Sequence, residues 1–141
     1  MAEVVRARTL CGRREERGTR EGKFDGLRYT GGMKMTPFPM SITDWAQVAP
    51  TRHAGDSGFA LWRTMNFDDL RVRMVEYSPG YVADHWCSKG HVILCLEGAL
   101  DIQLGDGKRL AMKQGESYHV GDGDPPHRSA TEKGAKLFIV D

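Results

Sequence analysis

The chain has no long hydrophobic run and no excess charge of one sign, and these two absences exclude several classes of protein. No stretch of its 141 residues approaches the roughly 20 apolar residues that a bilayer-spanning helix needs, and its beginning lacks the apolar core of a secretory signal. Twenty basic residues face 19 acidic ones, so no global field would recruit nucleic acid or a membrane. We therefore expect a cytoplasmic protein that binds neither nucleic acid nor membrane.

Cysteine is also scarce. The three cysteines, Cys11, Cys87 and Cys95, form no CxxC pair, and an odd number in a chain without an export signal argues against a disulfide framework. The chain also lacks a glycine-rich phosphate loop, a Gly-x-Ser-x-Gly elbow and internal repeats. The cysteines are therefore expected either to bind a metal or to be buried. Cys95, inside VILCL, is expected to be a small buried hydrophobe.

The composition divides the chain into two parts. Residues 1–32 hold eight basic and five acidic residues with few large apolar ones, a composition that cannot bury enough surface to fold alone. We expect a disordered basic leader there, and Met33 or Met35 would serve as alternative starts. Glutamates interleaved with its arginines argue against a nucleic-acid arm or a transit peptide. Residues 33–141 are expected to form one domain.

From about residue 34 onward, short apolar or alternating runs are separated by glycine, proline and aspartate, which is typical of an all-β domain. The expected strands are 59–64, 71–77, 82–87, 92–97, 100–104, 109–112, 117–120, 127–131 and 136–140. Turns are expected at Pro79-Gly80, at Gly98, at 105–107 and at 121–126. A single helix is expected at 41–49, with Thr43 or Asp44 as its N-cap. Many short strands without intervening helices favour an antiparallel sandwich or barrel, with a jelly roll foremost.

The octet DHWCSKGH at residues 84–91 is the most informative segment, because His85, Cys87 and His91 have a spacing that suits a shared metal ion. If residues 84–87 are extended, His85 and Cys87 project from the same face of a strand. The small, polar or flexible residues 88–90 permit the turn that would bring His91 to them.

The stretch PGYVADHWCSKGHVILCLEG, followed by KQGESYHVGDGDPPHRS, resembles the two sequence motifs of the cupin superfamily. More narrowly, it resembles the small single-domain bacterial cupins that carry an Asp-His-Cys-Trp-type motif. The matching positions are Gly80, His85, Cys87, His91 and Gly98 in the first motif and Gly115, Gly123 and His127 in the second. The resemblance covers roughly residues 58–141 and implies a single-domain cupin jelly-roll β-barrel.

The resemblance also implies a ligand set. It places four residues around one metal inside the barrel, namely His85, Cys87, His91 and His127. Cys87 stands where cupins usually have a second histidine, and His91 stands where they usually have glutamate. Three imidazoles and one thiolate suit zinc or iron best, while nickel or copper is also acceptable.

Several further side chains are expected near this site. Ile93 and Cys95 share the parity of His91, so a mostly apolar wall would favour a small organic ligand. Parity alone does not settle which of Arg71, Arg73 and Glu76 faces the interior, and a buried arginine there would argue for a carboxylate substrate.

Four other residues near the motifs are expected to have no role in binding the metal. Asp84 and Trp86 should point outward from the strand, with Asp84 at the surface or behind a ligand. His119 is expected to be structural, and His53 is expected to be exposed in a loop.

Two functions remain open at this point. The first is a metal-dependent enzyme, dioxygenase-like or isomerase-like, that acts on a small organic molecule. The second is a non-catalytic ligand-binding or structural cupin, because four protein ligands are the usual signature of a closed structural zinc site. A nucleophilic Cys87 beside His85 and His91 is a weaker alternative, since no third orienting group accompanies it. A homodimer is expected from the resemblance and from the apolar segments 59–64 and 136–140, taken as sheet edges.

Overall fold

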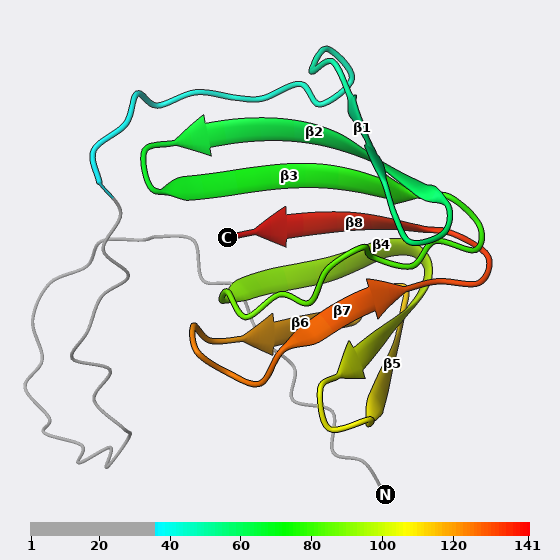
Figure 1. The fold of residues 1–141 in the computed structure, drawn as a ribbon. Coiled ribbons are helices and arrows are strands. Elements are labelled where there is room, and N and C mark those ends of the chain that lie inside the picture. The colour runs from blue at the N-terminus through cyan, green and yellow to red at the C-terminus, as the bar shows by residue number, and fades with distance from the viewer. Residues whose placement is uncertain (1–35) are drawn as a thin grey trace, which may run out of the picture. The chain divides into compact units, whose positions relative to one another are not determined.

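The computed structural model describes residues 36–141, and this part of the chain is built from eight β-strands (Figure 1). The predicted leader at 1–32 lies outside the described residues. The strands are β1 (Thr51–Ala54), β2 (Phe59–Phe67), β3 (Leu70–Tyr77), β4 (His91–Leu104), β5 (Arg109–Lys113), β6 (Ser117–Val120), β7 (His127–Ala130) and β8 (Ala135–Val140).

All strand pairings are antiparallel, and they form two layers that share β4 (Figure 1). In the larger layer β1, β2, β3 and β8 follow one another, and the first half of β4 lies between β8 and β6. In the smaller layer the second half of β4 lies between β5 and β7. This all-β arrangement confirms the predicted fold class.

Strand β4 passes from one layer into the other through an irregularity at Gly98. Segments 92–97 and 100–104, predicted as two strands, are one continuous strand, so the prediction that Gly98 ends a strand is wrong. The register between β4 and β8 shifts between Cys95 and Glu97. Gly98 has a φ of +80°, and a Cβ atom there would collide with the carbonyl oxygen of Gly134. Glycine is therefore required where the strand bends.

Two predicted elements are absent from the described structure. The prediction of a helix at 41–49 is wrong, because the chain makes only one turn there. In that turn the Gln47 amide donates a hydrogen bond to the Asp44 carbonyl at 3.0 Å. A segment this short does not repay the cost of helix nucleation. The prediction of a strand at 82–87 is also wrong. In this segment Val82 and Cys87 each form isolated bridges to neighbouring residues, and no continuous strand is present.

The two apolar segments that were expected at sheet edges are interior strands. β2 lies between β1 and β3, and β8 lies between β3 and β4. Their apolar side chains are explained by burial within this chain, so they give no support for a dimer. The homodimer remains a prediction.

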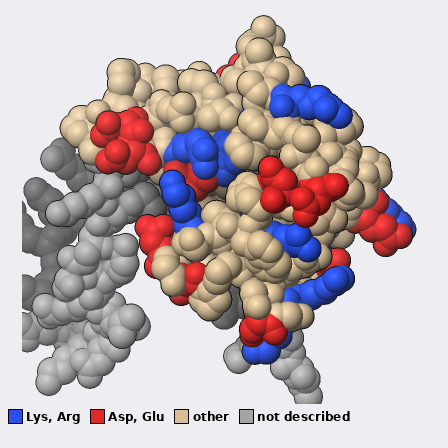
Figure 2. All heavy atoms as spheres, in the orientation of Figure 1, with Lys and Arg blue, Asp and Glu red and all other residues tan. Residues whose placement is uncertain are grey.

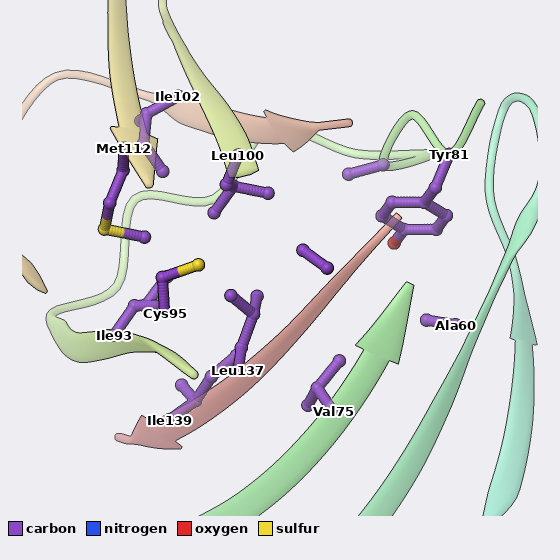
Figure 3. Packing of buried hydrophobic residues seen from close by; sticks show 12 residues of the cluster. Ala60, Val75, Tyr81, Ile93, Cys95, Leu100, Ile102, Met112, Leu137 and Ile139 are labelled. Carbon is purple, nitrogen blue, oxygen red and sulfur yellow. The ribbon is translucent and has the colours of Figure 1, made fainter. Parts of the chain in front are cut away.

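The core lies between the layers and is built from alternate residues of several strands (Figure 3). Ile93 and Cys95 on β4 meet Leu137 and Ile139 on β8. Cys95 is 1% exposed, which confirms that it is a small buried hydrophobe. On the outer face drawn in Figure 2, basic and acidic side chains are interspersed. No helix long and apolar enough to cross a membrane is present among residues 36–141.

Candidate metal centre

Three side chains from three different segments converge at the end of the barrel where β4 begins. His127 is the first residue of β7, His91 is the first residue of β4, and Cys87 lies in the loop before it. The Cys87 and His127 backbones exchange two hydrogen bonds, of 2.8 and 2.9 Å, so these residues sit directly opposite each other with neighbouring side chains. The possible ligand atoms of all three residues lie within 4.8 Å of one another.

The two histidines are in direct contact. Their Nε2 atoms are 2.9 Å apart and their rings meet edge to face, at 75°. Burial lowers the pKa of His91 to about 4, and the nearby His127 contributes to the shift. Burial also lowers the pKa of His127, against the opposing effects of the Pro125 carbonyl and Asp124. Both imidazoles are therefore neutral near pH 7, the form that binds a metal.

The donor set fits a borderline transition metal. One thiolate and two imidazoles suit zinc, iron, nickel or copper better than the oxygen-seeking magnesium or manganese. Two imidazole nitrogens on one tetrahedral zinc would be about 3.3 Å apart, so His91 and His127 would separate by a few tenths of an ångström. Three protein ligands leave one coordination position free, as in catalytic zinc sites.

The structure does not bring the fourth predicted ligand, His85, into this cluster. Ala83 and Cys87 are four positions apart in the sequence. Their backbone partners on β7, Ser129 and His127, are only two positions apart. The two additional residues bulge out of the sheet, which breaks the alternation on which the prediction rested. The His85 side chain is 64% exposed at the edge of the cavity, and its Nδ1 lies 2.6 Å from Oδ1 of Asp84.

The remaining residues of interest lie around the cluster. Trp86 points outward as predicted, is 47% exposed, and stacks under Arg128, whose Cζ is 4.9 Å from its ring centre. His119 is exposed on β6 and lies outside the cavity lining. The prediction that His53 is exposed in a loop is wrong, because His53 lies in strand β1 and its half-buried ring stacks on Trp62, with ring centres 3.9 Å apart.

The cluster borders a cavity of about 100 Å³. Ile93 and Ile139 contribute apolar surface, and the rings of Tyr77 and Tyr81 are stacked 4.1 Å apart in its wall. Burial raises the pKa of both tyrosines, which keeps the phenols neutral and able to donate a proton in a hydrogen bond. The charged residues of the lining are four bases, Arg71, Arg73, Lys89 and Arg128, and one acid, Asp141.

Two of these arginines share the one carboxylate. Arg71 binds Asp141 through Nε and Nη2, at 2.9 and 2.7 Å, and Arg73 donates to it at 2.5 Å. Burial lowers the pKa of Arg73, while Asp141 acts to raise it. Burial alone would raise the pKa of Asp141, but the Arg71 hydrogen bond and both positive charges lower it. Glu76, the third candidate, lies outside the cavity lining and pairs with Arg63 at 2.7 Å.

Trp62 and Asp141 also line the cavity, and sequence reasoning missed both. The sequence feature that could have placed Trp62 in the cavity is the tight hairpin between β2 and β3, in which Asp68 has a φ of +56°. Placing the turn at Asp68-Asp69 fixes the register and puts Trp62 on the same face as Arg73. Asp141 continues the inward parity of Leu137 and Ile139 on β8.

No family model matches this chain, and no curated protein matches it. Several solved structures do. A predicted oxalate decarboxylase from Thermotoga maritima superposes with a TM-score of 0.61 at 13% identity, covering 71% of this chain and 96% of that one. A sugar phosphate isomerase of the cupin superfamily from Silicibacter pomeroyi gives 0.56 at 18% identity, covering 71% and 74%. A polyketide cyclase from Streptomyces resistomycificus gives 0.57 at 20% identity, covering 72% and 78%.

These likenesses show the fold. The described part of the chain has the jelly-roll β-barrel fold of the matched cupin structures, which is the fold that the two sequence motifs predicted. The matched structures carry different activities in their names, so the fold alone does not identify the reaction. The side chains of the cavity therefore carry more information about function than the fold does.

Proposed function

We propose that this protein is a metal-dependent cupin enzyme that acts on a small organic molecule. Cys87, His91 and His127 would hold one divalent transition metal, with zinc or iron preferred by the donor set. The observation that carries the proposal is that three ligand atoms converge, not four. A structural zinc site is closed by four protein ligands, whereas three ligands leave a position for a substrate or water.

The bound metal would act as a Lewis acid on an oxygen of the molecule in the cavity. The chain's own residues would orient that molecule and exclude water. Ile93 and Ile139 provide apolar contact, and the neutral phenol of Tyr81 offers a hydrogen bond from the cavity wall. The cavity is smaller than the roughly 300 Å³ at which pockets for drug-sized ligands begin, so its ligand has few heavy atoms.

A closed, non-catalytic metal site is the competing function, and His85 is the residue that favours it. His85 borders the same cavity, two positions before Cys87. If its exposed ring turned inward, the site would gain the fourth ligand of a structural centre. The hydrogen bond between His85 and Asp84 opposes that movement.

We also propose that the chain is one of the small cupins with the Asp-His-Cys-Trp-type motif and that it works in the cytoplasm. The support is the octet at 84–91, which supplies two of the three converging residues. The three cysteines without a pairing pattern fit a reducing compartment.

Metal analysis of the full chain, followed by cobalt substitution, tests the proposal. We expect one metal per chain, and its loss in Cys87→Ser, His91→Gln and His127→Gln. His85→Gln is the matched control and should keep the metal. Azide should shift the cobalt absorption bands by occupying the free position. A chain that purifies without metal would refute the proposal. If His85→Gln also loses the metal, and azide leaves the cobalt bands unchanged, the closed four-ligand site is correct instead.

A further inference from the structure

Unpaired polar atoms are concentrated around the proposed metal site. Among residues 36–141, three buried side-chain nitrogens have no hydrogen-bond partner of good geometry, namely Nε1 of Trp62, Nε of Arg73 and Nδ1 of His127. All three residues line the same cavity. A buried polar group without a partner destabilises the folded protein, and native structures contain few of them. Their shared location indicates a binding site for a polar ligand.

The chemistry of two of these atoms defines what the ligand must offer. The indole Nε1 of Trp62 and the guanidinium Nε of Arg73 can only donate hydrogen bonds. The two groups are adjacent, because the Arg73 Cζ lies 4.4 Å from the centre of the Trp62 ring. The ring is in turn stacked on His53, which fixes its orientation from the other side. A ligand that satisfies both groups must therefore accept a hydrogen bond from each.

The charge of the cavity indicates an anion. Four basic side chains and one carboxylate line it, of which Arg128 is also paired with Asp56 outside the lining, at 3.2 Å, and a divalent metal would add further positive charge. Arg73 is only 7% exposed, and Asp141 is shared between Arg73 and Arg71. Burying a guanidinium is unfavourable unless enough negative charge surrounds it. A neutral ligand would leave this imbalance, whereas an anion would relieve it.

The geometry points to a carboxylate. Asp141 already shows this cavity binding a carboxylate, because its two oxygens accept three hydrogen bonds from Arg71 and Arg73. Nε of Arg73 and Nε1 of Trp62 both lack a partner, and the guanidinium lies over the indole ring, so a second carboxylate that reached both nitrogens would have one donor for each of its oxygens. The cavity of about 100 Å³ limits the ligand to a few heavy atoms.

We propose that the protein binds a small carboxylic acid, with its carboxylate on Arg73 and Trp62 and its other end facing Cys87, His91 and His127. The contact with Cys87, His91 and His127 rests on the metal site proposed above, whereas the contact with Arg73 and Trp62 does not. The substrate class would thus be short-chain carboxylates of the size of oxalate or pyruvate.

Calorimetric titration of the full chain tests the proposal, with oxalate, pyruvate and acetate as probes and acetamide and pyruvamide as neutral analogues. We expect at least one acid to bind about tenfold or more tightly than the amides. Trp62→Phe removes the indole N–H, and Arg73→Lys replaces the guanidinium, including its Nε–H, with an ammonium; each should weaken that binding about tenfold or more. Trp45→Phe and Arg63→Lys are matched controls outside the cavity and should leave the affinity within about twofold.

Each outcome bears on one proposal or the other. If the cobalt-loaded chain binds no acid, or if Trp62→Phe leaves the binding of the acid unchanged, the carboxylate site is overturned and the metal proposal stays intact. A chain that takes no metal but binds an acid through Trp62 and Arg73 supports the carboxylate site alone. Inorganic phosphate that binds more tightly than every carboxylate overturns the assignment. If Arg73→Lys does not fold, Trp62→Phe decides the question.

Discussion

Nε2 of His127 lies 2.9 Å from Nε2 of His91, although β7 pairs with the far end of the strand that His91 begins. His91 is the first residue of β4, and the backbone partner of His127 is Leu104, the last residue of β4. A straight strand would separate those two ends by about 43 Å. The two histidines meet because β4 bends from one layer into the other.

The bend at Gly98 predicts an effect of one methyl group. Gly98→Ala should destabilise the protein by about 3 kcal/mol or more, because a positive φ strains alanine and the new Cβ would collide with the carbonyl of Gly134. Gly107→Ala is the control, since Gly107 also has a positive φ but no atom within 4 Å of the new Cβ. It should cost about 1 kcal/mol. Urea unfolding of both variants measures the difference, and equal losses would contradict the role assigned to the bend.

The two motifs and their order indicated which side chains converge, whereas the local register that positions His85 could not be predicted from the sequence. Cys87, His91 and His127 converge as the two motifs implied. The prediction for His85 assumed a regular strand, and two additional residues opposite β7 turn that side chain outward. Bulges add residues without changing composition or polarity, so hydrophobic alternation does not reveal them. Asp141 was missed for a related reason, since its partners on β3 are set by pairing between strands that are distant in sequence.

The ion pair between Arg73 and Asp141 predicts a strong and pH-dependent contribution to stability. Asp141→Asn should cost on the order of 3–5 kcal/mol, because it leaves a buried guanidinium without its counter-charge. Asp106→Asn, at an exposed pair with Lys108, is the control and should change little.

The sign of the pH dependence follows from the lowered pKa of Asp141. The native state binds this proton less readily than the unfolded state, so the contribution is present above the unfolded value of about 3.9 and is lost as the pH falls through the native value. Chemical unfolding between pH 7 and pH 2.5 should show the wild type and Asp141→Asn converging at low pH. A constant difference across that range would assign the effect to packing instead.

The two described cysteines should differ in reactivity. Cys87 is half-buried at the edge of the cavity, whereas Cys95 is 1% exposed in the core. We expect iodoacetamide to modify Cys87 in the metal-free protein, zinc to protect it, and Cys95 to react only on unfolding. Peptide mass spectrometry assigns each site and separates Cys11 from both. Labelling of Cys87 that zinc does not slow would show that its sulfur is not a ligand.

The expected homodimer depends on a different surface from the one the sequence indicated. β2 and β8 are interior strands, but Met40 and Ile42, in the segment before β1, are fully exposed. Large apolar side chains in that position lose their unfavourable contact with water when a second copy covers them. Light scattering during size exclusion should therefore give twice the chain mass of 15.7 kDa, and a double variant, Met40→Ser with Ile42→Ser, should shift the protein toward monomer. Gln47→Ser, in the following turn, is the control. A wild-type monomer at micromolar concentration would refute the dimer, and a dimer indifferent to both substitutions would place the interface elsewhere.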